Sequence, residues 1–396
     1  MYRMILDEAT YRYADTKYIY YPGDYEFSVS DFSVNLSIEE CSTIQFTIYP
    51  DHPYYNDFIL RKSMISFYRD DKPLFYGQVR EVSTGMDRAK TIYAVSELAF
   101  LLDTYQVPQY YSGQNFEWIV GEMLIKHNAI AGADKQFNLG DVSGPGLDYQ
   151  GLQEISTNYD LTLDVFRNQM SQYTQRTNRG PRSFQQYINV HHVPDVAFAP
   201  RYLDIFNFHA GSNVPDFINQ PIRLKLNLME FESAADSQDF ITAVVPLGAE
   251  LSTEAAPGVK NRVTIKSVND EKLYIQNDMN VADFGFICEV VEFDGITSPS
   301  QLKLEGQKYL YTKSAFNRKI ELTAFDLSLI NVNYDQFEIG KRVWVYEPYQ
   351  ETAEDEFHTQ EYIADEAAYG TKSAFGIVAM NIVPLNPDQS TMTLVG

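Results

Sequence analysis

The fold is decided by residues 43–82, which read TIQFTIYPDHPYYNDFILRKSMISFYRDDKPLFYGQVREV. Ile44, Phe46 and Ile48 alternate with polar neighbours, the period-two pattern of a strand with one buried face. Two further apolar runs, 63–68 and 74–82, are joined by a turn-forming Asp-Asp-Lys-Pro segment. Runs bounded in this way predict a β-hairpin. We therefore expect residues 1–104 to form a β domain.

Beyond residue 104 the apolar spacing becomes helical. One face of the predicted helix holds apolar side chains three and four residues apart: Phe116, Ile119, Val120, Met123 and Leu124. Asn115 is a suitable cap for this helix. A second helix from about residue 148 and a strand over 161–166 follow. Residues 105–220 are therefore predicted to be a small α/β domain.

A basic island, residues 167–201, lies within this domain. It has one acidic residue, Asp195, against five arginines: Arg167, Arg176, Arg179, Arg182 and Arg201. Its first half is rich in Gln, Asn, Ser, Thr, Gly and Pro, which favours a long loop or an extended hairpin. Aromatic side chains are not interleaved at a regular spacing, so we interpret the island as an interaction loop rather than a nucleic-acid site.

Strand patterns return over residues 221–396. Alternation at 222–228 predicts a half-buried strand, and further strands are expected at 320–324, 343–346 and 375–383. Ser298 and Pro299 open a predicted helix near 299–311. The segment 347–366 holds eight acids and no Lys or Arg, which indicates a solvated loop. The sequence of residues 375–378 is similar to that of residues 75–79, as expected if the chain contained two related barrels.

The composition narrows the class of protein. The 396 residues carry 54 acids and 31 bases, a net charge of −23, with 29 Tyr and 25 Phe. This aromatic content excludes a disordered acidic tail and favours a β-rich protein with large contact surfaces. The chain lacks a 20-residue apolar run and a signal-peptide pattern, so we expect synthesis in the cytoplasm and no direct membrane insertion. Its negative charge should repel DNA.

Few residues are candidates for catalysis, cofactor binding or metal binding. His191 and His192 could bind a metal, but neighbours on a strand point to opposite faces, so ordinary surface or interface histidines are favoured. Cys41 and Cys288 read as small core residues. The acidic loop 347–366 lacks the spacing of a calcium loop. We therefore predict no catalytic, cofactor-binding or metal-ligating residue.

Five elements resemble, in order, those of the phage tail-associated protein or prophage endopeptidase tail family: residues 46–55 (FTIYPDHPYY), 75–79 (FYGQV), 123–128 (MLIKHN), 245–249 (VPLGA), and 324–327 with 339–343 (AFDL and IGKRV). The family is related to phage baseplate hubs. The resemblance implies an α+β, mostly β protein with two tube-type β-barrel domains, 1–104 and 221–396, and an inserted α/β domain, 105–220.

The resemblance also implies a function. It predicts a homotrimer whose ring closes the tail tube, at the tail tip of a virion. The expected partners are a distal tail protein ring and the tail tube on one side and a fibre, spike or lytic module on the other. DNA would pass through without specific binding. Two alternatives remain: a peptidoglycan-degrading tail endopeptidase, and a carbohydrate-binding protein that contacts the receptor. Because no lytic motif accompanies the shared region, we expect a structural protein rather than an enzyme.

Overall fold

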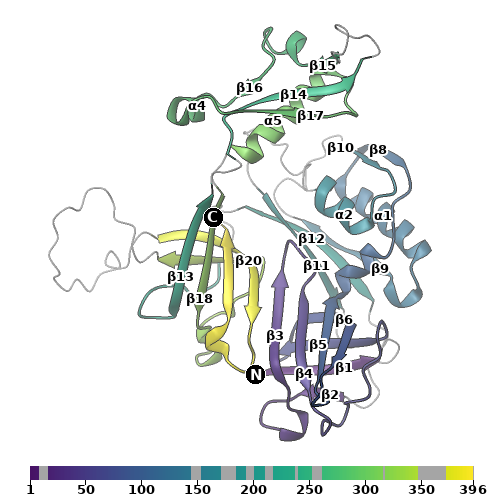
Figure 1. The fold of residues 1–396 in the computed structure, drawn as a ribbon, viewed down its shortest axis with the longest axis vertical. Coiled ribbons are helices and arrows are strands. Elements are labelled where there is room, and N and C mark those ends of the chain that lie inside the picture. The colour runs from purple at the N-terminus through teal and green to yellow at the C-terminus, as the bar shows by residue number, and fades with distance from the viewer. Residues whose placement is uncertain are drawn as a thin grey trace, which may run out of the picture. The chain divides into compact units, whose positions relative to one another are not determined.

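The structure is a computed structural model that describes residues 1–8, 17–143, 153–170, 184–192, 200–209, 217–236, 240–251, 261–314, 317–346 and 372–395. The chain divides into two compact units. Unit 1 comprises residues 1–174, 184–232 and 320–396, and unit 2 comprises 175–183 and 233–319. Both chain ends lie in unit 1 (Figure 1).

A curled sheet of twelve strands dominates unit 1 (Figure 1). In spatial order its strands are β13 (Leu228–Asp236), β18 (Asn317–Ala324), β21 (Thr391–Val395), β20 (Lys372–Ile382), β3 (Ser30–Ser37), β4 (Thr43–Ile48), β7 (Lys90–Ser96), β6 (Lys72–Thr84), β5 (Ser63–Arg69), β1 (Tyr2–Glu8) and β2 (Lys17–Tyr20), with β19 (Arg342–Tyr346) paired to β20. The predicted hairpin is confirmed as β5 and β6, with Phe67 opposite Phe75. The mostly β, α+β class is also confirmed.

Strands from the two ends of the chain share this sheet and one apolar core. Val34 of β3 pairs with Ile382 of β20, which joins the first and the last parts of the sequence. Phe46 and Ile377 are both fully buried in the same core. The predicted domain boundaries at residues 104 and 220 and the two separate barrels stay predictions.

The middle of the chain adds a small α/β lobe to unit 1. Helix α1 (Phe116–Ile130) begins as predicted, because the Asn115 side chain accepts a hydrogen bond from the Trp118 N–H at 2.8 Å. All five apolar residues predicted for its inner face are buried. The lobe also contains the pair β8 (Gln109–Gln114) and β10 (Gln153–Thr157), and a sheet of β9 (Phe137–Ser143), β12 (Arg201–His209) and β11 (Phe184–His192). Strands β11 and β12 pair as an antiparallel hairpin, whereas most of the first half of the basic island, for which a loop or an extended hairpin was expected, lies outside the described residues.

Two predictions within this lobe were wrong. Residues 161–166 form helical turns instead of a strand: α2 (Thr162–Asp164) runs into a π-helix, Val165–Met170. The segment buries Thr162, Leu163, Val165 and Phe166, and a short apolar run of this kind does not distinguish helix from strand. The helix expected near 148 is absent from its described part, since Gln153–Thr157 is a strand.

The strand predicted at 222–228 was also wrong. Residues 224–227 form a turn in which Leu226, Asn227 and Leu228 donate their N–H groups to the Arg223 carbonyl. The Asn227 side chain accepts from the Arg223 N–H at 3.1 Å and is buried, whereas Leu224 is exposed. A local side chain to backbone bond competes here with the ladder that alternation alone would predict.

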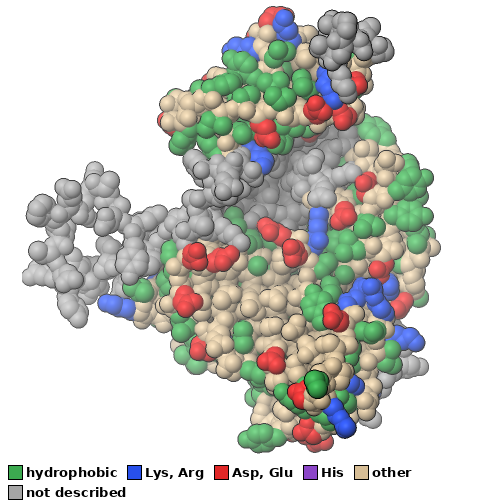
Figure 2. Space-filling model, viewed as in Figure 1, with side chains coloured by type: hydrophobic (Ala, Val, Ile, Leu, Met, Phe, Trp, Pro, Cys, Tyr) green, Lys and Arg blue, Asp and Glu red, His purple; other side chains and the backbone are tan. Residues whose placement is uncertain are grey.

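Unit 2 is a four-stranded sheet covered by a helix. Its elements are β14 (Ala243–Glu250), β15 (Arg262–Thr264), β16 (Ile275–Gln276), β17 (Cys288–Glu292), α4 (Asp278–Phe284) and α5 (Pro299–Lys313). Helix α5 confirms the start predicted at Pro299, with Leu302 and Leu310 buried. Apolar side chains are exposed around α4 and β17, among them Met279 and Val290 (Figure 2). No helix in the described ranges is long and apolar enough to cross a membrane.

Candidate functional site

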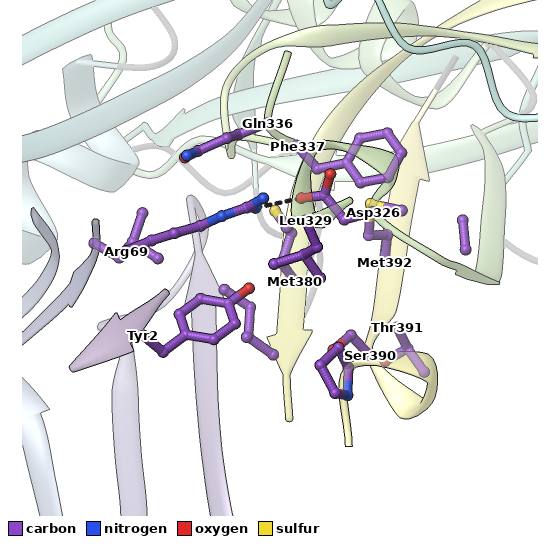
Figure 3. A pocket seen from close by; sticks show the side chains of 14 residues that line it. Tyr2, Arg69, Asp326, Leu329, Gln336, Phe337, Met380, Ser390, Thr391 and Met392 are labelled. Atoms are coloured by element: carbon purple, nitrogen blue, oxygen red, sulfur yellow. Dashed lines mark hydrogen bonds and ion pairs between the residues drawn. The ribbon is translucent and has the colours of Figure 1, made fainter. Parts of the chain in front are cut away.

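A cavity of unit 1 lies where strands from the two ends of the chain meet. Tyr2 and Arg69 come from β1 and β5, and Met380 and Met392 come from β20 and β21 (Figure 3). The loop after β18 closes another side with Asp326, Leu329, Gln336 and Phe337. The solvent-accessible volume is about 30 Å³, room for about two water molecules.

Arg69 is the central polar residue of this cavity. It is almost fully buried, and its guanidinium binds the Asp326 carboxylate (Figure 3). The guanidinium also binds the Ser328 hydroxyl. Asp326 in turn accepts from the Ser328 N–H at 3.0 Å. The buried Gln220 carboxamide, with its nitrogen toward Asp326, donates to that carboxylate at 3.1 Å. These bonds offset the free-energy cost of removing the charged guanidinium from water.

The Tyr2 ring closes the cavity beside Arg69. It stacks on Phe67 with ring centres 5.4 Å apart, and the Arg69 guanidinium carbon lies 5.7 Å from the Tyr2 ring centre. Burial raises the pKa of the Tyr2 hydroxyl, and the nearby Arg69 charge opposes this shift. The hydroxyl therefore stays protonated at neutral pH and is available as a donor or an acceptor.

The adjacent histidines of the basic island each meet a different carboxylate. The His191 Nδ1 lies 2.5 Å from an Asp204 oxygen, and the His192 Nε2 lies 2.5 Å from a Glu97 oxygen. Arg201 forms an ion pair with the second Glu97 oxygen at 2.8 Å. The side chain of His192 is 3% exposed and that of His191 is 45% exposed. One strand thus presents one histidine inward and one outward, as its alternation requires.

Two further histidines, His52 and His127, are buried and hydrogen-bonded. His52 Nε2 lies 2.9 Å from the Ile19 carbonyl, and His127 Nε2 lies 3.0 Å from the Lys135 carbonyl. Because a carbonyl only accepts, each Nε2 carries the proton in the neutral ring. Burial lowers the pKa of both imidazoles. Both rings therefore hold chain segments together.

The two cysteines differ. Cys41 is partly buried and packs against the core of the α/β lobe, as predicted. Burial raises the pKa of its thiol, with Arg167 opposing, so the thiol is not activated as a nucleophile. Cys288 is exposed on β17, so its interpretation as a core residue was wrong. Its strand is a parallel neighbour of β14 with alternate side chains exposed, a topology that the local sequence does not reveal.

Other candidate segments fall partly or wholly outside the described residues. The acidic loop 347–366 is one, and Arg176, Arg179 and Arg182 of the basic island are others. Across the described ranges, no three His, Cys, Asp or Glu side chains are placed to hold a metal ion. Sequence patterns did not identify Arg69, Asp326 or Glu97, since their partners are far away in the chain; Arg69 and Asp326 are 257 residues apart.

Comparisons with known proteins show similarity to phage tail proteins. Residues 218–365 match the profile of the family described as prophage endopeptidase tail. A prophage tail protein from Listeria monocytogenes EGD-e has a similar fold, with a TM-score of 0.51, 15% identity, and 100% of this chain and 94% of that one covered. The tail protein from Neisseria meningitidis MC58 gives a TM-score of 0.58, 10% identity, and 100% and 96% coverage. No curated protein sequence matches the chain.

A third solved structure has the same kind of fold. The 43 kDa tail protein of prophage MuSo2 from Shewanella oneidensis has a TM-score of 0.56 at 10% identity, with 99% of this chain and 97% of that one covered. The three solved structures, all titled as phage or prophage tail proteins, show that the chain shares their fold. The resemblance to the prophage endopeptidase tail family, drawn from the sequence, is confirmed by the match over residues 218–365.

Proposed function

We propose that this protein is a structural component of a phage or prophage tail tip, a hub that closes the tail tube. The observation that carries the proposal is the joining of strands from both chain ends in one sheet, in a chain whose second half matches a tail family. A continuous sheet around one core is a rigid frame, which suits a part that transmits load. Buried polar side chains such as His52, His127 and the Arg69–Asp326 pair hold chain segments of this unit together.

The proposed assembly is a homotrimer in which each chain contributes two barrel-like halves to a ring. A distal tail protein ring and the tail tube would lie on one side, and a fibre, spike or lytic module on the other. The net charge of −23 supports a conduit that repels DNA phosphates, so that the genome passes without adhering. The protein would then be part of the virion.

The oligomeric state tests this assembly. Size-exclusion chromatography with light scattering should give three times the 45.4 kDa chain mass, and electron microscopy should show rings. A monomer at every concentration, without rings, would contradict the hub. DNA binding by the purified protein should show little dependence on salt concentration, because the proposal includes no phosphate contacts. Salt-dependent DNA binding would contradict the negative conduit.

We propose no catalytic role, and the His191–Asp204 pair offers the sharpest test of that view. A carboxylate that orients a half-exposed histidine is also an arrangement used in general base catalysis. Zymography on purified peptidoglycan should show no clearing by the wild-type chain. Clearing that His191→Gln abolishes, while the protein remains folded, would instead establish the tail endopeptidase.

A further inference from the structure

The cavity at the junction of the two chain ends combines apolar walls with a polar floor. The walls are formed by Leu74, Leu329, Phe337, Met380, Pro387 and Met392. Thr391, at the rim, is exposed. Walls of this kind exclude water from any group bound on the floor and strengthen its hydrogen bonds.

Two polar atoms of residues that line this cavity have no hydrogen-bond partner among the described residues. One is the Arg69 Nε, a donor on a side chain that is 4% exposed, and the other is the Gln336 Oε1, an acceptor. Both residues line the same cavity (Figure 3). Unpaired buried polar atoms are rare and costly in folded proteins, so their position indicates a ligand that accepts one hydrogen bond and donates another.

The charges around the cavity favour a neutral ligand. The terminal nitrogens of Arg69 are already bound by Asp326 and Ser328. An anion in the cavity would be repelled by the Asp326 carboxylate, and a cation would be repelled by the Arg69 guanidinium. A neutral group avoids both repulsions. A carboxamide is neutral, carries one acceptor oxygen and a donor nitrogen, and its three heavy atoms need little more room than two water molecules.

We propose that this cavity binds the carboxamide of an asparagine or glutamine side chain from a partner protein. The carboxamide oxygen accepts from the Arg69 Nε–H, and its nitrogen donates to the Gln336 Oε1. The aliphatic part of the side chain lies against the apolar walls near Met380 and Met392. The site recognises a polar anchor residue on a docked segment and ties that segment to both ends of this chain. The proposal does not depend on the trimer.

Three matched probes test the ligand chemistry on the full chain. They are the N-acetyl, N′-methylamide derivatives of glutamine, glutamate and methionine, which share a backbone and have similar length. In ligand-observed NMR titrations we expect the glutamine probe to bind about fivefold more tightly than either control, the effect of one neutral hydrogen bond. Equal affinity of the three probes, or the absence of binding, would overturn the proposal in favour of ordered solvent only. Tighter binding of the glutamate probe would overturn it in favour of an anion site.

Variants locate the site without disturbing the Arg69 ion pair. Gln336→Met removes the acceptor and should weaken binding of the glutamine probe about fivefold. Thr391→Trp places a large ring at the rim and should abolish binding. Gln389→Met changes an exposed glutamine outside the cavity lining and is the matched control. Each variant should keep the thermal unfolding midpoint of the wild type, and unchanged affinity in folded Gln336→Met would refute the assigned acceptor.

Discussion

His127 should make the stability of the α/β lobe depend on pH. Its imidazole is fully buried, with Nδ1 2.6 Å from the Thr104 hydroxyl and Nε2 3.0 Å from the Lys135 carbonyl. Since Nε2 donates to the carbonyl, Nδ1 must accept from Thr104. The neutral ring has both nitrogens bonded in this way, and burial lowers the pKa of the imidazole, which disfavours the protonated ring.

The sign of the pH effect follows from the lowered pKa. Burial lowers the pKa of His127; the hydrogen bond to the Lys135 carbonyl and the Asp103 charge oppose this shift, and the Lys135 charge adds to it. Below the unfolded-state pKa of about 6.5 the unfolded chain binds a proton that the folded site refuses. The free energy of unfolding therefore falls with decreasing pH, by up to about 1.4 kcal/mol per pH unit for this one group. Above the unfolded-state pKa this contribution is fully retained.

Two substitutions separate the hydrogen bonds from the titration. His127→Leu leaves the Thr104 hydroxyl and the Lys135 carbonyl without their partner, and should lower the unfolding free energy at pH 7.5 by about 2–4 kcal/mol. Because leucine does not titrate, the difference in unfolding free energy between this variant and the wild type should become smaller as the pH falls toward 5. Thr104→Val removes one hydroxyl but keeps the histidine, so it should cost about 1–2 kcal/mol and retain the pH slope.

Urea unfolding followed by Trp118 fluorescence measures these effects. Trp118 lies on α1, and Trp344→Phe removes the signal from the large sheet. His52, which burial also holds at a lowered pKa, contributes the same slope to all the variants and cancels in the differences. A gap between wild type and His127→Leu that stays constant from pH 7.5 to 5 would refute the lowered pKa and the neutral ring.

Other substitutions test the remaining packing arguments by urea denaturation or amide exchange. Asp326→Ala leaves the Arg69 charge unpaired and should lower the unfolding free energy by about 3–5 kcal/mol. The double variant Arg69→Met, Asp326→Leu should lower it clearly less, and equal losses in the two variants would contradict the argument that the unpaired charge is the cause. Gly140→Ala would put a Cβ 2.1 Å from an Asp204 oxygen, so amide exchange in β9 should accelerate; unchanged rates would exclude this contact. Asn115→Ala removes the α1 cap and should cost about 1 kcal/mol; no loss would show that the cap is dispensable.

Local patterns predicted those elements whose burial follows a single period. The alternation at Ile44, Phe46 and Ile48 and the stripe of α1 gave the right structure, because one face of each element packs on a core. Residues 161–166 and 222–228 failed for different reasons. The first buries four of its six residues, including neighbours along the chain, so no single period is visible. In the second, Asn227 bonds to the Arg223 backbone and closes a turn.

The cavity could not be predicted in the same way. Arg69 ends a strand of the hairpin, and its sequence context resembles any exposed strand end. Its burial depends on Asp326, a residue on a loop 257 positions later that reaches Arg69 only when the two chain ends share a sheet. A contact of this kind is set by topology and not by local propensity. Motif matching also cannot find it, since a lone Arg and a lone Asp have no characteristic spacing.

The residues that carried the family resemblance are residues that the fold requires. His52 ties its segment to Ile19, and Asn128 pairs its side chain with both backbone groups of Phe137, at 2.9 and 2.7 Å. Gly340 has φ +79°, and a Cβ there would lie 2.8 Å from the Tyr187 ring. Such residues indicate how the chain packs. A relative can keep this packing and have a different catalytic activity. The resemblance therefore identifies a tail fold, and the peptidase in the family description has to be demonstrated through a site of its own.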